Sequence, residues 1–330
     1  MRRPTWRPPG ESRPRIALGV ARYAPAALVA ALLVATSVAF VYTEKLKLTP
    51  SPIVGTRVDK VFSPVCDCDT DTARISFRLR EADVVGIQII DRGDTVVREL
   101  VRARSAQRGR LTFTWNGRDD ESLVVPEGRY RPRVHLASER RTIVLPNPIR
   151  VDVTPPQIEL RSLRPRVFSP DGDRRRDRVE VGYRVDEAAR VGLFVDGRQR
   201  VRKQGQKQEG TIAWFGRVDG QSLPRGVYRL ELSARDIAGN LGVRTPAKPV
   251  VIRYVALVRT RIETAPGRRF GVRVLSDAAR VAWRFGQSSG ESSPGRLGLR
   301  APLVPGRYRL TVTANGHRDR GVVIVREPAP

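Results

Sequence analysis

The longest uninterrupted apolar stretch of the chain lies near its N-terminus. Residues 24–42 read APAALVAALLVATSVAFVY and carry no charge. At a rise of about 1.5 Å per residue, a helix of this length reaches across the roughly 30 Å hydrocarbon core of a bilayer. The pattern therefore predicts one transmembrane helix over residues 23–43.

The charges on the two sides of this stretch differ. Residues 1–22 hold six arginines and one acid, whereas only Glu44, Lys45 and Lys47 follow the stretch closely. Segments rich in arginine and lysine next to a transmembrane helix tend to stay on the cytoplasmic side of the membrane. We therefore expect a single-pass protein of the cell membrane, with residues 1–22 as a basic cytoplasmic arm and the bulk of the chain extracytoplasmic. A cleaved signal peptide is the alternative; it is disfavoured by the length of the stretch and the lack of a small-x-small site.

Beyond the apolar stretch, apolar and polar residues alternate in short runs. Ile75, Phe77 and Leu79 alternate with polar or charged residues, which is the period-two pattern of a strand buried on one face. Such runs, separated by Gly and Pro turns, predict an all-β chain of β-sandwich modules in series. No useful helical period appears outside the anchor.

Two stretches that begin 106 residues apart resemble each other. They read FSPVCDCDTDTARISFRLREADVVGIQI from Phe62 and FSPDGDRRRDRVEVGYRVDEAARVGLFV from Phe168. A third unit lacks this FSP loop but keeps the closing motifs, DAARVAW and VPGRYRLTV. Self-similarity of this kind predicts repeated modules, which we place at 50–152, 153–254 and, shorter and divergent, 255–327, with VDVTPP (151–156) as a proline-stiffened hinge.

The motifs FSP-x-G-D-x-x-x-D, W-x-G-R-x-D and P-x-G-x-Y resemble the FlgD-type immunoglobulin-like domain family. This family is named after the flagellar hook-capping protein and recurs as an accessory module of bacterial surface and secreted proteins. The resemblance covers Val58 to about Ile252 as two copies, and a divergent third unit matches only in its closing strands. It implies tandem immunoglobulin-like sandwiches behind the transmembrane helix. A flagellar role does not follow, since the anchor replaces the hook-capping protein's own N-terminal region and this fold hosts many functions.

The large aromatic residues are predicted to build the cores. Trp115 aligns with Trp214, and Tyr130 aligns with Tyr228 and with Tyr308 of the third unit. A sandwich without a disulfide between its sheets needs large side chains there. We also expect the tyrosine hydroxyls to bond back to nearby backbone, as in a tyrosine corner.

Acidic residues gather in both FSP loops, as oxygen ligands for calcium would. An EF-hand loop starting at the first of them would need glycine and glutamate where Thr72 and Arg78 stand, and three arginines (174–176) inside the second loop would repel a cation. The alternative is that the carboxylates accept backbone N–H groups in Asx-type turns. The Asx-turn interpretation is preferred, and no cofactor is predicted. Calcium is the less favoured possibility; its candidate ligands are Asp67, Asp69 and Asp71 in the first loop and Asp171, Asp173 and Asp177 in the second.

Both cysteines of the chain, Cys66 and Cys68, lie in the first loop. They can pair with each other, pair with another molecule, bind a metal together or stay free. Two thiolates make a poor zinc site, because zinc takes four ligands. In an oxidising exterior we expect the intramolecular disulfide first and intermolecular pairing second. A disulfide that closes so small a ring stabilises the folded state by at most about 1.6 kcal/mol. This is enough to shape a loop but not to hold a domain together.

Catalytic chemistry has few candidate residues. His135 and His317 are the only histidines, and no nucleophile elbow, phosphate loop or zinc-ligand spacing accompanies them. His135 is expected on the solvent side of a strand and His317 in a turn. The sequence therefore predicts a protein that is not an enzyme.

The chain is strongly basic, with a net charge of +27, or +22 once the predicted arm is subtracted. Of 61 basic residues only six are lysine, and the arginines are spread along the strands rather than gathered. The sequence shows no recognition helix of the kind that sequence-specific DNA-binding proteins place in the major groove. The leading hypothesis is a membrane-anchored, non-catalytic stalk or interaction protein of a bacterial cell surface. The alternative is an arginine-rich receptor for an anionic envelope polymer or DNA.

Overall fold

A computed structural model describes residues 24–47 and 50–327, with one helix and 27 strands in that part of the chain. The helix, α2 (Ala24–Lys47), is long and apolar enough over Pro25–Thr43 to cross a membrane, and none of that stretch is buried. Within it, Thr36 donates its hydroxyl to the Leu32 carbonyl at 2.9 Å. The predicted basic arm, residues 1–22, lies outside the described residues.

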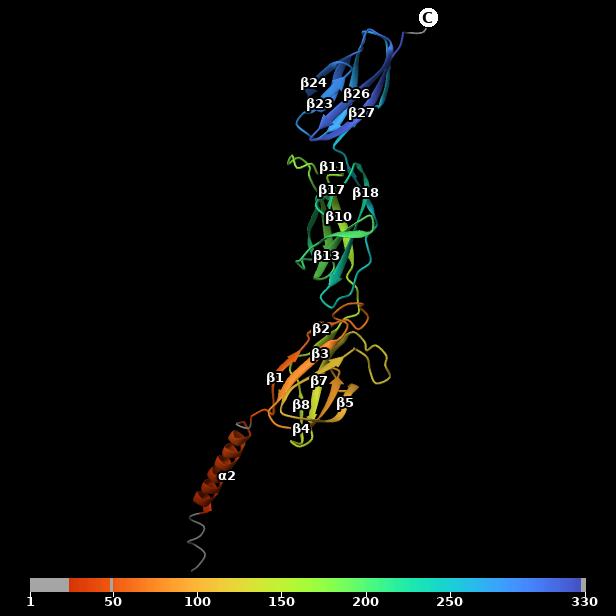
Figure 1. The fold of residues 1–330 in the computed structure, drawn as a ribbon. Helices are drawn as coiled ribbons and strands as arrows, with labels where there is room; N and C mark the ends of the chain where they lie inside the picture. Colours follow the sequence, from red (N-terminus) through yellow and green to blue (C-terminus); the bar gives the residue numbers. More distant parts are fainter. Residues whose placement is uncertain (1–23, 48–49, 328–330) are drawn as a thin grey trace, which may run out of the picture.

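Three β-sandwiches follow the helix end to end, as Figure 1 shows. We call them sandwich 1 (β1–β9), sandwich 2 (β10–β19) and sandwich 3 (β20–β27). Each surrounds its own hydrophobic core, and the three cores are built from residues between Ile53 and Val325, with no residue of α2 among them. The predicted all-β, immunoglobulin-like fold class is confirmed. Because the cores are independent of the helix, residues 50–327 hold what they need to fold without it.

Sandwich 1 packs a sheet of order β1-β3-β6 against one of order β2-β9-β7-β4-β5, with β8 beside β7. The short β2 pairs with β9 in parallel, whereas the long strands are antiparallel. The strands span β1 (Ile53–Val58), β2 (Val61–Phe62), β3 (Ala73–Leu79), β4 (Asp83–Ile90), β5 (Val96–Ala106), β6 (Gly109–Trp115), β7 (Gly128–Leu136), β8 (Arg141–Val144) and β9 (Ile149–Val151).

Sandwich 2 has the same plan, with sheets of order β10-β12-β15 and β11-β19-β18-β13-β14 and a small hairpin, β16-β17. Its β11 pairs with β19 in parallel, as β2 does with β9. The strands span β10 (Ile158–Arg164), β11 (Val167–Phe168), β12 (Val179–Val185), β13 (Ala189–Val195), β14 (Arg198–Arg202), β15 (Glu209–Trp214), β16 (Arg217–Val218), β17 (Gln221–Ser222), β18 (Gly226–Asp236) and β19 (Lys248–Ile252).

Sandwich 3 is smaller, with sheets of order β20-β22-β25 and β21-β27-β26-β23-β24. Its strands also bury alternate residues, as in β26, where Leu310, Val312 and Ala314 face the core. The strands span β20 (Val255–Leu257), β21 (Arg261–Thr264), β22 (Arg269–Ser276), β23 (Val281–Phe285), β24 (Ser288–Ser292), β25 (Gly295–Arg300), β26 (Gly306–Ala314) and β27 (His317–Val325).

An aromatic cluster fills the centre of sandwiches 1 and 2. Trp115 is fully buried, and its ring meets Phe62 and Tyr130 edge-on at centroid distances of 5.5 and 5.2 Å. In sandwich 2, Trp214 meets Phe168 and Tyr228 at 5.7 and 5.8 Å. Edge-to-face pairs of this kind stabilise a core beyond the area they bury.

The tyrosine at the start of each closing strand bonds to the loop before it. The hydroxyls of Tyr130, Tyr228 and Tyr308 donate to the carbonyl four residues earlier, at 2.7, 2.8 and 2.9 Å. Tyr130 is buried, whereas Tyr228 and Tyr308 are half-buried at the edge of their cores. The bond fixes the angle at which the P-x-G-x-Y loop enters the strand.

Candidate functional site

The first FSP loop, residues 63–72, lies at the end of sandwich 1 that faces sandwich 2 (Figure 1). Cys66 and Cys68 form a disulfide within it. The Thr70 hydroxyl is 3.2 Å from Cys68 Sγ and donates to the Ala238 carbonyl of sandwich 2 at 2.7 Å. The disulfide therefore shapes a loop that contacts the next sandwich.

The surface that receives this loop is the turn after β18. Gly239 in that turn has a φ of +106°, and a Cβ added there would overlap Cys68 Sγ. Only glycine combines that backbone angle with so close an approach. The disulfide and Gly239 thus form one packed contact between the two sandwiches.

A buried amide connects the linker to the same turn. Asn240 is 3% exposed, and its Nδ2 donates to the Asp152 carbonyl at 3.0 Å and to Asp236 Oδ2 at 2.8 Å. Asp236 Oδ1 accepts the backbone N–H groups of Gly239 and Asn240 at 2.7 and 2.8 Å. Since buried polar groups are costly unless they are paired, this network holds the linker in one position on sandwich 2.

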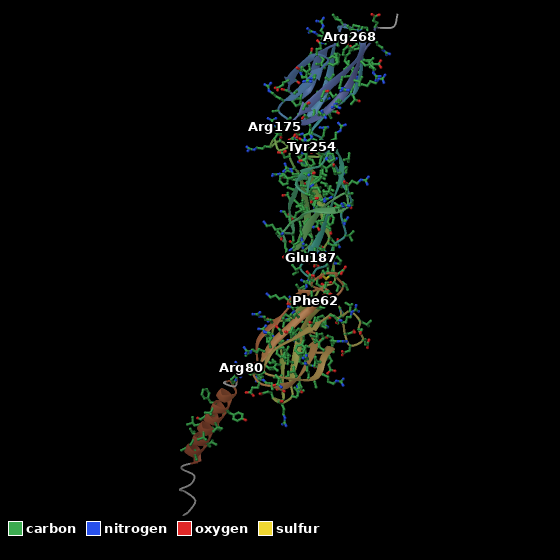
Figure 2. All side chains as sticks on the ribbon, in the orientation of Figure 1. Phe62, Arg80, Arg175, Glu187, Tyr254 and Arg268 are labelled. Carbon is green, nitrogen blue, oxygen red and sulfur yellow. A yellow bond between two sulfur atoms is a disulfide. The ribbon has the colours of Figure 1, made fainter. Side chains whose placement is uncertain are left out.

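Three carboxylates meet beside that network. Ligand oxygens of Asp152, Glu187 and Asp236 lie within 4.8 Å of one another. Burial raises the pKa of Asp152, which the Arg150 charge partly offsets. Burial also raises the pKa of Glu187, and the negative charges of Asp236 and Asp152 raise it further. Figure 2 shows Glu187 at the end of sandwich 2 that faces sandwich 1.

The second FSP loop contacts sandwich 3. Ser169 bonds through its hydroxyl to the Asp277 carboxylate. Asn315 Nδ2 donates to Asp171 Oδ2 at 3.1 Å and to Asp173 Oδ2 at 3.0 Å. Burial raises the pKa of both Asp171 and Asp277. Both FSP loops therefore contact the sandwich that follows them.

Further contacts close this second joint. Arg225 Nη1 lies 2.9 Å from Asp319 Oδ1, and Asp319 Oδ2 accepts the Leu257 backbone N–H at 2.9 Å. Tyr254 stacks on His317 with ring centroids 3.5 Å apart. His317, which we expected in a turn, is the first residue of β27. Figure 2 places Tyr254 and Arg175 where sandwiches 2 and 3 meet.

The carboxylates proposed as calcium ligands have different surroundings in the two loops. Oxygens of Asp171, Asp173 and Asp177 lie within 4.8 Å of one another. Both oxygens of Asp177 accept loop N–H groups, from Gly172 and Arg174, at 2.7 Å each. This favours the preferred Asx-turn interpretation of the second loop, and calcium there stays the untested alternative. The candidates of the first loop, Asp67, Asp69 and Asp71, form no such group in the described part of the chain.

The two histidines lie far apart in the fold. His135 is exposed on β7, with Nδ1 3.1 Å from Thr142 Oγ1. His317 belongs to the second joint. The structure therefore brings the two imidazoles to no common site.

Four arginines gather on the outer face of sandwich 3, although the sequence indicated only a diffuse distribution. They line a hollow of about 630 Å³ that also includes Glu291. Register explains the gathering, because β23 pairs with β26 and β26 pairs with β27, so the outward residues of all three strands share one face. The arginines are Arg284, Arg309, Arg318 and Arg320.

Comparison with known proteins agrees with this fold. Residues 64–139, within sandwich 1, match the FlgD Ig-like domain, so the chain contains an FlgD-type immunoglobulin-like domain. The resemblance noted in the sequence is thereby confirmed for this region. No curated protein matches the chain.

Solved structures that match the chain share little sequence with it. The fibronectin(III)-like modules of Clostridium thermocellum CbhA are 15% identical with a TM-score of 0.33, over 60% of this chain and 93% of that one. The I-band fragment I67-I69 from titin is 13% identical with a TM-score of 0.30, over 85% and 100%. A solved chain from a study of a 1.5-MDa bacterial ice-binding adhesin is 10% identical with a TM-score of 0.28, over 84% of this chain and 99% of the solved one.

Proposed function

We propose that the chain is a single-pass membrane protein of a bacterial cell surface whose sandwiches form a stiff, non-catalytic arm outside the membrane. The arm spaces or presents a partner rather than transforming a substrate. Its partners are then the membrane, through α2, and a surface protein or envelope polymer.

The observation that carries this proposal is the specific contact at both joints. Freely hinged modules are joined by exposed linkers that few contacts cross. Here Thr70 and Asn240 make bonds at the first joint, and Asn315 and Arg225 do so at the second. Bonds that fix direction at successive joints make a series of modules act as one body.

The membrane part of the proposal rests on the apolar helix and the charges around it. Over Pro25–Thr43, α2 satisfies its backbone groups internally, as a bilayer requires. The six arginines of residues 1–22 favour a cytoplasmic N-terminus. The sandwiches then stand outside, where the Cys66–Cys68 disulfide persists.

Protease added to intact, wall-stripped cells is expected to release one fragment that contains all three sandwiches. The cut falls between α2 and β1, because the contacts at both joints protect the links between sandwiches. Mass spectrometry of the released material and blotting of the cell-retained N-terminus measure this. Single-sandwich fragments at low protease would contradict the stiff arm, and protection of the chain beyond Thr43 would contradict the topology.

A second candidate function follows from the arginine hollow of sandwich 3. Four guanidinium groups on one face favour an anionic polymer such as a wall polymer or DNA. The hollow lies in sandwich 3, the last of the three along the chain and the one farthest from α2 in Figure 1. We propose this anionic-polymer receptor as the alternative to the partner-spacing arm.

Replacing Arg309, Arg318 and Arg320 by glutamate is expected to lower the salt concentration at which residues 50–327 elute from heparin. The log–log salt slope should fall by roughly two to three, since three phosphate- or sulfate-binding charges are lost. The control replaces three exposed arginines of sandwich 1 and changes the net charge equally: Arg78, Arg102 and Arg104. Equal elution of the two triple variants would show diffuse attraction only and sink the alternative.

A further inference from the structure

The three carboxylates at the first joint come from separate parts of the chain. Asp152 follows β9 in the linker, Glu187 lies in the turn between β12 and β13, and Asp236 ends β18. Their ligand oxygens nevertheless lie within 4.8 Å of one another. Folding therefore forces together three like charges that repel each other, at a place where two of them are buried.

One oxygen of this cluster lacks a hydrogen-bond donor. Asp152 is 1% exposed, and its Oδ2 is buried without a hydrogen bond in the described structure. Arg150 Nη2 lies 2.8 Å away as an ion-pair partner, but the Arg150 side chain is 46% exposed, and its Nη2 is also 3.9 Å from Glu127 Oε1. One exposed cation, shared with a fourth carboxylate, leaves the buried group incompletely compensated.

Glu187 is a carboxylate of the cluster that has neither a hydrogen bond nor an ion-pair partner in the described structure. Asp236 and Asp152 face it, and Asp186 precedes it. Burial is the largest cause of the raised pKa of both Asp152 and Glu187, and the negative charge of Asp236 raises both further. The charge of a bound cation offsets both the cost of burying these carboxylates and their repulsion.

We propose that the joint between sandwiches 1 and 2 binds one Ca²⁺ through Asp152, Glu187 and Asp236. All the donors are hard oxygens, and neither imidazole nor thiolate lies in the cluster, which disfavours zinc and other softer metals. Carboxylates brought in from a linker, a turn and a strand end form an irregular cage. Ca²⁺ tolerates such a cage, whereas Mg²⁺ demands near-ideal octahedral geometry.

The comparable group in the second FSP loop is a poorer candidate. There Asp177 uses both oxygens for backbone N–H groups, and Asp171 and Asp173 each give an oxygen to Asn315. At the first joint Asp236 is likewise occupied, but Asp152 Oδ2 and Glu187 accept no hydrogen bond in the described structure. The two groups therefore differ in how many carboxylate oxygens accept hydrogen bonds, and at the first joint the one contact of Asp152 Oδ2 is its ion pair with the exposed Arg150.

The ion connects the linker after sandwich 1 to two elements of sandwich 2. When it enters, Arg150 moves from Asp152 toward Glu127, which it already approaches. The ion then fixes the direction of the first joint. This consequence rests on the proposed stiff arm, whereas the binding itself rests only on the three carboxylates.

Calorimetric titration of metal-free residues 50–327 with CaCl₂ tests the site without membrane or partner. We expect a saturable site that Glu187→Gln and Asp152→Asn each weaken about tenfold or more, because a charged ligand is lost from the cage. The matched control, Glu159→Gln, changes an exposed glutamate of sandwich 2 and should keep the affinity within about twofold, since screened surface charge acts weakly.

Near-UV circular dichroism checks that the variants stay folded. Absence of a saturable Ca²⁺ site in the wild type would overturn the proposal. So would a Glu187→Gln variant that binds Ca²⁺ as tightly as the wild type, or equal losses in Glu187→Gln and Glu159→Gln. None of these outcomes bears on the arm or its location, which the protease experiment tests separately.

Discussion

Replacing Trp115 by alanine is expected to lower the free energy of unfolding of sandwich 1 by about 3–5 kcal/mol. The indole is fully buried between the sheets and contacts the rings of Phe62 and Tyr130. Its removal leaves a cavity that the strands around it cannot fill. Hydrogen exchange of the β3 and β6 amides in residues 50–327 measures the loss without depending on tryptophan fluorescence.

A matched pair of milder variants separates packing from hydrogen bonding. Trp115 Nε1 donates to the Arg118 carbonyl at 3.0 Å, whereas Trp214 Nε1 is buried without a partner in the described structure. Trp115→Phe therefore removes a bond, while Trp214→Phe removes an unsatisfied donor, a difference of about 1–3 kcal/mol. Trp214→Phe should thus be the better tolerated. Equal costs, or a greater cost at Trp214, would contradict this account of the two cores.

Gly239→Ala is expected to open the joint between sandwiches 1 and 2 while both stay folded. The new Cβ overlaps Cys68 Sγ, so the disulfide loop must move away from the turn after β18. The bond from Thr70 to the Ala238 carbonyl is then lost. Small-angle X-ray scattering of residues 50–327 should change from a stiff rod, with a radius of gyration well above the about 19 Å of a compact chain this long, to a flexible pair of bodies.

The control for this variant is Gly220→Ala. Gly220 also has a positive φ, +80°, and lies in the same sandwich, but a Cβ there meets nothing within 4 Å. It therefore carries the backbone cost of about 1–2 kcal/mol without the clash. If both variants scatter alike, the joint does not depend on the contact between Gly239 and the disulfide.

Much of the fold can be predicted from the sequence because its causes are local. An uncharged stretch of membrane length produces α2, and period-two alternation produces strands such as β3 and β12. The aligned tryptophans and tyrosines point inward because large apolar rings have no other place in a sandwich. The helix in the structure is longer than the predicted 23–43 and ends at Lys47, since polar residues continue a helix beyond the stretch that marks it.

The candidate site was predicted less well. Their proximity along the chain made Asp171, Asp173 and Asp177 candidate calcium ligands. In the structure, Asp171 and Asp173 instead accept hydrogen bonds from Asn315 at the joint between sandwiches 2 and 3. No pattern marks Asn240, Asn315 or Gly239, because a single amide or glycine in a turn has no periodicity. The arginines of the sandwich 3 hollow likewise look dispersed until the register of β23, β26 and β27 puts them on one face.

The sequence by itself determined the apolar helix, the alternating strands and the aromatic cores, whereas it only placed the local disulfide first among the possible fates of Cys66 and Cys68. Each of these depends on residues close in the chain or on burial alone. Only the tertiary structure decided that the FSP loops contact the sandwiches that follow them and that three distant carboxylates share one joint. Thr70 meets Ala238 across 168 residues and Asn315 meets Asp171 across 144. Contacts at such separations depend on how complete sandwiches dock, which no local pattern specifies.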